Sequence, residues 1–147
     1  MNIKDTNLSE NTIKKLIKSA IEARKNAYTP YLEFQTGAAI LTKEDKIFTG
    51  CNIQSAVLSP NICAERTAIF KAVSEGYKDF KAIAVVGGSI DKDIEDYCPP
   101  CGICRQVMLE FCDPDTFYII LAKSENDFII YSLAELSPLS FSAKSIN

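Results

Sequence analysis

The chain has 147 residues, 47% of them hydrophobic, and a net charge of −3. This length fits one domain with an ordinary core, so we expect a single domain over residues 1–147. The slight acidity, with both signs interspersed, argues against a partner that is a nucleic acid or an acidic membrane. Because no apolar run reaches the ~18 residues of a membrane span and the polar start Met1–Glu10 does not look like a signal peptide, we expect a cytoplasmic protein.

The first part of the chain predicts a helix and then a hairpin. Ser9 or Asn7 is suited to cap the helix, and Pro30 is expected to end it. The apolar residues at helical spacing are Ile13, Leu16, Ile17, Ala20, Ile21 and Tyr28. Two short apolar runs, Phe34–Leu41 and Ile47–Ile53, flank a polar turn at 43–46 and indicate two paired strands.

The second part alternates helices and strands. Gly76 is placed to close a helix, the acidic residues 91–96 indicate a solvated loop, and Pro99 and Pro100 precede a further helix. Helices are expected over Cys63–Glu75, Gly102–Phe111 and Ser132–Leu136, and strands over Ala82–Val86, Phe117–Leu121 and Phe128–Tyr131. The last two strands are antiparallel if their connection is short. This order predicts a three-layer α/β/α domain on a mixed sheet.

The cysteines are the informative residues. The chain has six cysteines and no histidine. In a cytosolic protein they are not a disulfide framework, and a transition-metal site here must use thiolates and carboxylates. Cys51, Cys98 and Cys112 have no partner at ligand spacing and are expected to be small buried or surface residues.

Three cysteines lie in two motifs, Cys63-Ala64-Glu65-Arg66 and Pro100-Cys101-Gly102-Ile103-Cys104-Arg105. A Cys-x-x-Cys pair by itself also fits a redox motif or half a zinc ribbon. Here the pair comes late in the chain, and no second pair completes a ribbon. Three thiolates are the number expected of a catalytic Zn²⁺ that keeps one position open for water.

Helix geometry restricts how these residues can share one site. In a regular helix Cys63 and Glu65 would point about 200° apart, so both can serve one metal only if Cys63 lies at or before the first turn. The field of a helix N-terminus also favours thiolates. Arg66, three residues after Cys63, is placed to donate to a thiolate and draw charge from it; the alternative is an ordinary surface arginine.

The two motifs resemble those of the cytidine deaminases, in the small form with three cysteine zinc ligands. The resemblance covers residues 28–111 and resumes weakly at 134–141. It implies a five-stranded mixed sheet between helices, a homo-oligomer that is usually a tetramer, and hydrolytic deamination of a cytosine nucleoside such as cytidine or deoxycytidine. Cys63, Cys101 and Cys104 match the zinc ligands, and Glu65 matches the residue that moves protons.

The same resemblance implies substrate contacts. Asn52 matches a residue that hydrogen-bonds the ribose, and the backbone N–H of Ala64 matches a donor to the pyrimidine carbonyl. Phe34 and Phe141 match aromatic walls around the base, the second supplied by a neighbouring subunit; either ring could instead be ordinary packing. Gln54 stands where the family commonly has Glu, and residues 55–58 also depart from the family pattern. The reaction is therefore better specified than the substrate.

Three alternatives stay open at this point. The departures at the sugar-binding segment allow a modified cytosine nucleoside or an antibiotic of the blasticidin S type. A catalytically inactive zinc-binding interaction protein is also possible, although Glu65 has no use in a purely structural site. Editing of RNA or DNA is disfavoured by the acidic balance.

Overall fold

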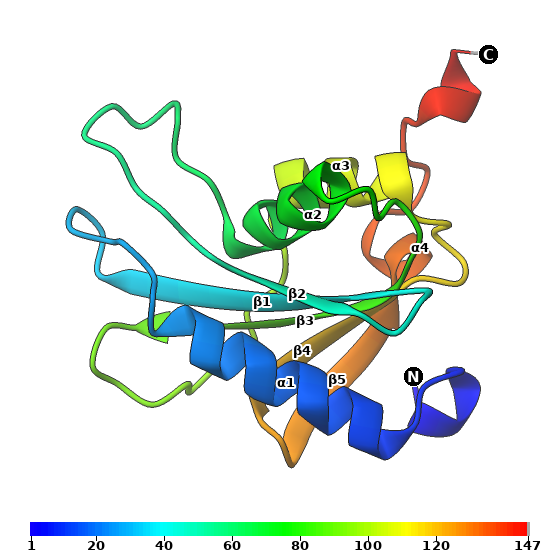
Figure 1. Cartoon of the computed structure of the whole chain (residues 1–147), viewed down its shortest axis with the longest axis horizontal. Helices are drawn as coiled ribbons and strands as arrows, with labels where there is room; N and C mark the ends of the chain where they lie inside the picture. Colours follow the sequence, from blue (N-terminus) through cyan, green and yellow to red (C-terminus); the bar gives the residue numbers. More distant parts are fainter. Residues whose placement is uncertain (147) are drawn as a thin grey trace.

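A five-stranded sheet forms the middle of the computed structural model, which describes residues 1–146 (Figure 1). In chain order its elements are η1 Ile3–Asp5, α1 Glu10–Arg24, β1 Phe34–Thr42, β2 Ile47–Cys51, α2 Ala64–Ser74, β3 Phe80–Ser89, α3 Gly102–Phe111, β4 Tyr118–Ser124, β5 Asp127–Ser132, α4 Leu133–Leu136 and η2 Ala143–Ser145. Helix α1 covers one face of the sheet, and α2 and α3 cover the other. The predicted three-layer α/β/α architecture is confirmed.

The strand order in the sheet is β2-β1-β3-β4-β5. Strand β1 pairs antiparallel with both β2 and β3, and β4 pairs antiparallel with β5 as predicted. Strands β3 and β4 are parallel, with α3 in the crossover between them. The sheet is therefore mixed, and the helices α2 and α3 both lie in connections that return to its centre.

The core divides by strand alternation. In β1, Ala38 and Ile40 face α2 and α3, whereas Ala39 and Leu41 face α1. Phe34 and Thr36 continue the α2 and α3 side by the same alternation, and Gln35 falls on the α1 side. Both faces are buried along most of β1 and β3, which explains their nearly continuous apolar sequences.

The first helix is shorter than its apolar spacing predicts. Ser9 caps it, since its Oγ accepts from the Thr12 N–H at 3.1 Å, but the helix ends at Arg24 and not at Pro30. Tyr28 lies outside the helix and is 57% exposed. Its N–H donates to the Asn52 carbonyl at 3.1 Å, so a tertiary hydrogen bond replaces the next helical one.

Two strand boundaries also differ from the expectation. Strand β2 ends at Cys51 instead of Ile53, because the Asn52 carboxamide takes over the pairing with β1. Strand β3 extends over 80–89, beyond the expected Ala82–Val86, because it pairs with β1 from Phe34 to Thr42. The remaining boundaries agree within three residues, and the largest difference is the end of β4, at Ser124 instead of Leu121.

Glycine allows the closest helix approach to the site. A Cβ on Gly50 of β2 would lie 2.4 Å from the Ala64 carbonyl oxygen and 2.5 Å from the Ala68 nitrogen, both backbone atoms of α2. Only a residue without a side chain lets the first turns of α2 lie this close to the sheet. Gly50 therefore fixes the depth at which the Cys63–Arg66 segment sits.

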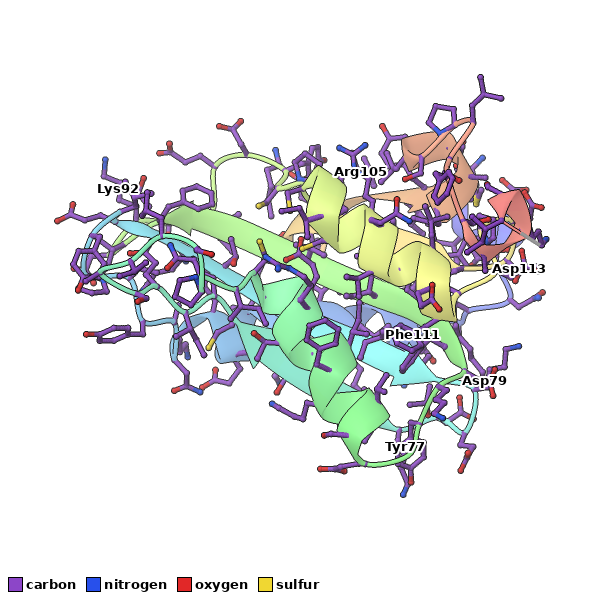
Figure 2. The ribbon with its side chains drawn as sticks, turned by 90° about the horizontal axis from the view of Figure 1, so that it is seen from above. Tyr77, Asp79, Lys92, Arg105, Phe111 and Asp113 are labelled. Carbon is purple, nitrogen blue, oxygen red and sulfur yellow. The ribbon has the colours of Figure 1, made fainter. Side chains whose placement is uncertain are left out.

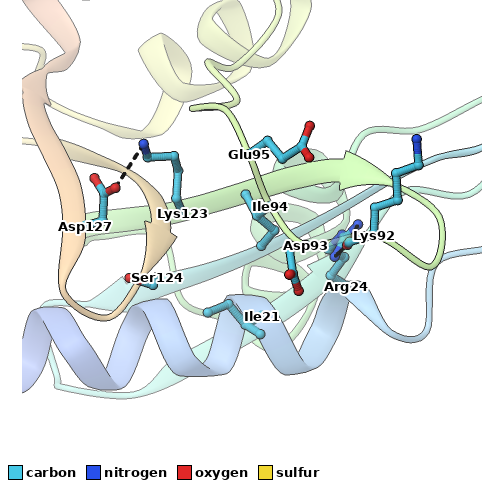
Figure 3. Close-up of a pocket in the computed structure, with 9 residues that line it drawn as sticks. All are labelled: Ile21, Arg24, Lys92, Asp93, Ile94, Glu95, Lys123, Ser124 and Asp127. Carbon is cyan, nitrogen blue, oxygen red and sulfur yellow. Dashed lines mark hydrogen bonds and ion pairs between the residues drawn. The ribbon is translucent and has the colours of Figure 1, made fainter.

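The segment between β3 and α3 is held at both ends by hydrogen bonds to neighbouring elements. Figure 3 shows the groove beside it, with Arg24, Ile94 and the Lys123–Asp127 pair. The Arg24 guanidinium donates to the Ser89 carbonyl at 2.7 Å, and Lys123 pairs with Asp127 at 2.9 Å. Tyr97 donates to the same Asp127 carboxylate. A groove of about 490 Å³ lies between these groups, and Ile94 packs from the segment onto the α1 face. The acidic residues of the segment are exposed, which confirms the predicted solvated loop.

Candidate metal centre and active site

Cys63 precedes the first turn of α2. It is the N-cap residue of that helix, with φ −76° and ψ 157°, and α2 itself begins at Ala64. An extended N-cap frees its side chain from the helical rotation, so the condition that allows Cys63 and Glu65 to serve one site is met. Gly50 holds this end of the helix against β2.

The second cysteine motif has the same construction. Cys101 is the N-cap of α3, and its Sγ accepts from the Cys104 N–H at 3.5 Å. Cys104 is buried in the first turn. Arg105, to which sequence analysis assigned no role, donates to the Pro100 carbonyl at 2.9 Å and to the Leu136 carbonyl at 2.6 Å. These bonds tie the start of α3 to α4.

The starts of α2 and α3 bring the three sulfur atoms together. Figure 2 shows both helices from above, with Arg105 near the start of α3 and Phe111 at its end. The Sγ atoms of Cys63, Cys101 and Cys104 all lie within 4.8 Å of one another, and those of Cys63 and Cys101 are 3.8 Å apart. Tetrahedral zinc with Zn–S bonds of ~2.3 Å requires sulfurs about 3.8 Å apart. Three soft thiolates at this spacing fit zinc, so the cluster is positioned to hold that ion.

The environment of the sulfurs favours charge on one of them first. A hydrogen bond from the Cys104 thiol lowers the pKa of Cys63 to about 5 against the opposing effect of burial, and Arg66 contributes in the same direction. Arg66 Nη2 lies 3.4 Å from the Cys63 sulfur. The interaction with Cys63, together with burial, raises the pKa of Cys104. Zinc binding must therefore displace a proton from Cys104, and Arg66 lies where it can draw charge from the sulfurs.

Glu65 is the buried acid of the site. Its side chain is only 4% exposed, and burial raises its pKa to about 7, with the Cys63 charge adding to the effect. A carboxyl group that titrates near neutrality can both take up and release a proton at that pH. Glu65 lies in the first turn of α2, directly after the Ala64 amide at the helix start.

A cleft of about 290 Å³ opens above these groups. Seven of the residues singled out in the sequence line it: Phe34, Asn52, Gln54, Cys63, Glu65, Arg66 and Cys101. Ala64 is buried at the start of α2. Phe141 is not among the residues that line the cleft; it lies in the C-terminal segment, 63% exposed, and its carbonyl accepts from Gln106. The single chain therefore gathers seven of the predicted site residues in the cleft and Cys104 in the adjoining sulfur cluster, whereas Ala64 and Phe141 do not line the cleft.

Several cleft residues could not be identified from the sequence. Thr36, Asn61, Cys98 and Pro99 also line the cleft. Cys98 packs so closely on β3 that a Cβ on Gly87 would meet its sulfur at 2.6 Å. These residues lie in β1 and in the loops that precede the two motifs, and no spacing rule identifies them. The only signal was the position of Cys98 and Pro99 immediately before the second motif.

A buried glutamate beside three cysteines at two helix N-termini, on an α/β/α sheet, defines the class of zinc-dependent nucleobase deaminases. The chain belongs to the cytidine and deoxycytidylate deaminase family. The model of that family's zinc-binding region matches residues 10–120, which include every cysteine of the site.

Known proteins support the assignment over most of the chain. The chain is 47% identical to a cytidine deaminase of Halalkalibacterium halodurans, over 90% of this chain and 96% of that protein, and 42% identical to a cytidine deaminase of Sporosarcina psychrophila, over 92% and 95%. A crystal structure of cytidine deaminase from Burkholderia pseudomallei superposes with a TM-score of 0.78 at 42% identity, covering 86% of this chain and 97% of that one.

Proposed function

We propose that this protein hydrolyses the exocyclic amino group of cytidine and deoxycytidine, giving the uracil nucleoside and ammonia. The observation that carries the proposal is the buried Glu65 carboxylate beside the cysteine cluster in a cleft of nucleoside size. The relatives named cytidine deaminase, at up to 47% identity over most of the chain, support it.

The residues at the reactive end of the cleft have different roles in the reaction. Cys63, Cys101 and Cys104 would hold a zinc ion, which would supply the Lewis acid that makes water a nucleophile near neutral pH. Glu65 takes one proton from that water and passes it to the ring nitrogen; it then passes the second, from the hydroxyl group now on the ring carbon, to the amino group, which departs as ammonia. Its burial suits this exchange, because the carboxyl group can hold a proton between the two steps. Arg66 offsets the negative charge of the sulfurs.

The rest of the cleft suits the remainder of a nucleoside. We infer that the Ala64 backbone N–H, at the start of α2, donates to the pyrimidine carbonyl, and that Phe34 stacks on the base. Asn52 and Gln54 then meet the sugar. Because their carboxamides are uncharged, this end of the cleft suits a neutral sugar.

A modified cytosine nucleoside is the second candidate substrate. The chain is 34% identical over 109 residues to a blasticidin-S deaminase of Bacillus cereus, over 71% of this chain and 75% of that protein. The uncharged Gln54 at the sugar end favours this candidate, since a carboxylate there would demand a hydroxyl donor. The alternative of an inactive zinc-binding protein is opposed by Glu65, a buried acid with no structural use in the cleft.

The test is ammonia release from cytidine, deoxycytidine, cytosine and blasticidin S, with the Glu65→Gln variant beside wild type. We expect turnover of the two nucleosides, and a fall of at least ~100-fold in the variant, the low end for loss of general acid–base catalysis. Zinc content should stay unchanged, because Gln is isosteric. Turnover of blasticidin S alone would transfer the proposal to the second candidate, and an active Glu65→Gln variant would contradict the role of Glu65.

We also propose a homo-oligomer, most simply a tetramer, in the cytoplasm. Large apolar side chains remain exposed on the single chain: Tyr28, Tyr31, Leu32, Val57, Leu58, Ile103, Leu139 and Phe141. Such surfaces are typical of subunit interfaces, and a partner is needed if Phe141 is to reach a cleft. The six free cysteines suit a reducing compartment. An active monomer in light scattering would refute the assembly.

A further inference from the structure

Gln54 makes an unusual set of hydrogen bonds for a residue that lines a ligand cleft. Its Oε1 accepts from the backbone N–H groups of Tyr31 and Leu32 at 3.1 and 3.0 Å. Its Nε2 donates to the Leu32 carbonyl at 3.0 Å. All three bonds cross more than twenty residues of chain and join the end of the β2 region to the loop before β1.

These partners also fix which way the carboxamide points. Two backbone N–H groups require an acceptor, and a carbonyl requires a donor, so exchanging the oxygen and nitrogen of Gln54 would lose all three bonds. A carboxamide oxygen accepts two hydrogen bonds and its nitrogen donates two. The acceptor capacity of Gln54 is therefore used up, and one N–H remains.

Asn52 provides the contrast within the same cleft. Its Oδ1 accepts from the Thr36 N–H at 2.8 Å, and its Nδ2 donates to the Phe34 carbonyl at 2.9 Å. One lone pair and one N–H of Asn52 stay free for a ligand. A hydroxyl group can therefore donate to or accept from Asn52, whereas at Gln54 it can only accept.

We propose that Gln54 has two roles. It holds the Tyr31–Leu32 loop at the cleft, and it offers the ligand one N–H donor and no acceptor. Residues Tyr31 and Leu32 are 53% and 64% exposed. Because their side chains pack little against the rest of the chain, the hydrogen bonds to Gln54 are important for the position of this loop. The ligand group that meets Gln54 is then an acceptor. Because Glu65 and the sulfurs occupy the reactive end of the cleft, that group belongs to the sugar of the substrate.

The contact between Gln54 and the sugar is tested with fluorinated sugars, and this part of the proposal rests on the proposed function. Fluorine replaces a hydroxyl at similar size, accepts weakly and donates nothing. The kcat/KM ratio of cytidine to its 2′-fluoro-2′-deoxy and 3′-fluoro-3′-deoxy analogues is measured in wild type, Gln54→Glu and Gln54→Met. For one analogue we expect the ratio to rise about ten-fold in Gln54→Glu, because a carboxylate prefers the hydroxyl donor and repels fluorine.

Gln35→Glu is the matched control. It places the same new charge on β1, on the α1 side of the sheet, and Gln35 does not line the cleft. Its ratios should stay within about two-fold of wild type, a difference of only a few tenths of a kcal/mol. A variant that merely deforms the loop would slow all substrates alike and leave the ratios unchanged. Unchanged ratios in Gln54→Glu would contradict the proposed contact between Gln54 and the sugar.

The role of Gln54 in holding the loop is tested without any substrate, by amide hydrogen exchange over residues 28–33. Gln54→Glu loses the bond to the Leu32 carbonyl and should speed exchange about five-fold, as expected for about one hydrogen bond. Gln54→Met loses all three bonds and should speed it further. Exchange rates equal to those of wild type in both variants would contradict the role of Gln54 in holding the loop. A wild-type protein inactive on every cytosine nucleoside would instead contradict the proposed function. The exchange rates would still show whether Gln54 holds the loop.

Discussion

Gly50→Ala should disturb the active site without touching a catalytic residue. The new Cβ would lie 2.4 Å from the Ala64 oxygen and 2.5 Å from the Ala68 nitrogen. Because carbon contacts are most favourable at ~3.5–4.0 Å, relief of this overlap requires α2 to move outward by roughly 1 Å. Both clashing atoms are backbone, so no rotamer change can absorb the movement, and Cys63 and Glu65 must move with the helix.

The expected cost follows from that displacement. Overpacking of a tight contact destabilises by about 1–3 kcal/mol, and a misplacement of about 1 Å near a reacting group can reduce the rate ~100-fold. We expect Gly50→Ala to lower the free energy of unfolding by about 2 kcal/mol, from urea titration, and kcat/KM for cytidine by at least about ten-fold.

Gly102→Ala is the matched control for stability. Its Cβ would meet no atom of the described chain within 4 Å, and Gly102 begins α3. Alanine at a helical position compatible with it should leave stability unchanged or raise it by up to about 1 kcal/mol. If Gly50→Ala matched wild type within about 0.5 kcal/mol and about two-fold in kcat/KM, the close approach of α2 would not control the site, and the reasoning from packing would be wrong.

Two further predictions concern the metal and the C-terminal segment. Cys104→Ser should lose most of its zinc in elemental analysis and melt at least about 5 °C below wild type, because metal binding is coupled to folding; full zinc occupancy in that variant would remove Cys104 from the ligand set. Removal of residues 141–147 should reduce kcat/KM for cytidine at least about ten-fold while zinc is retained, if Phe141 completes a neighbouring cleft; undiminished turnover would mean that this ring takes no part.

The metal centre could be predicted from sequence because its requirements are local. Residues two apart, Cys63 and Glu65, cannot converge within a regular helix, so Cys63 had to precede the first turn, and it is the N-cap of α2. Cys101 and Cys104 are three residues apart at the start of a helix, and their sulfurs meet. Such short-range geometry is decided almost entirely by the sequence spacing.

The sugar end of the cleft could not be predicted in the same way. Gln54 owes its orientation to the backbone of Tyr31 and Leu32, 23 and 22 residues earlier in the chain. Tyr28 continued the apolar helical spacing, but its N–H pairs with Asn52 once the fold brings them together. Phe141 does not line the cleft of the single chain. Long-range pairing and assembly leave no periodic signal.

The separation of the zinc ligands along the chain has a consequence for biosynthesis. Cys63 and Cys101 are 38 residues apart, and α2 and β3 lie between them. At ~5–20 residues per second of translation, roughly 2–8 s pass between the emergence of the first and the second ligand. A cross-link closing a loop of this length removes unfolded-chain entropy worth about 4 kcal/mol, if zinc acts as a disulfide does in that respect. If these cysteines hold the zinc, the metal can be captured only after the middle strand has been made, and the folded state, as well as the turnover, then depends on zinc.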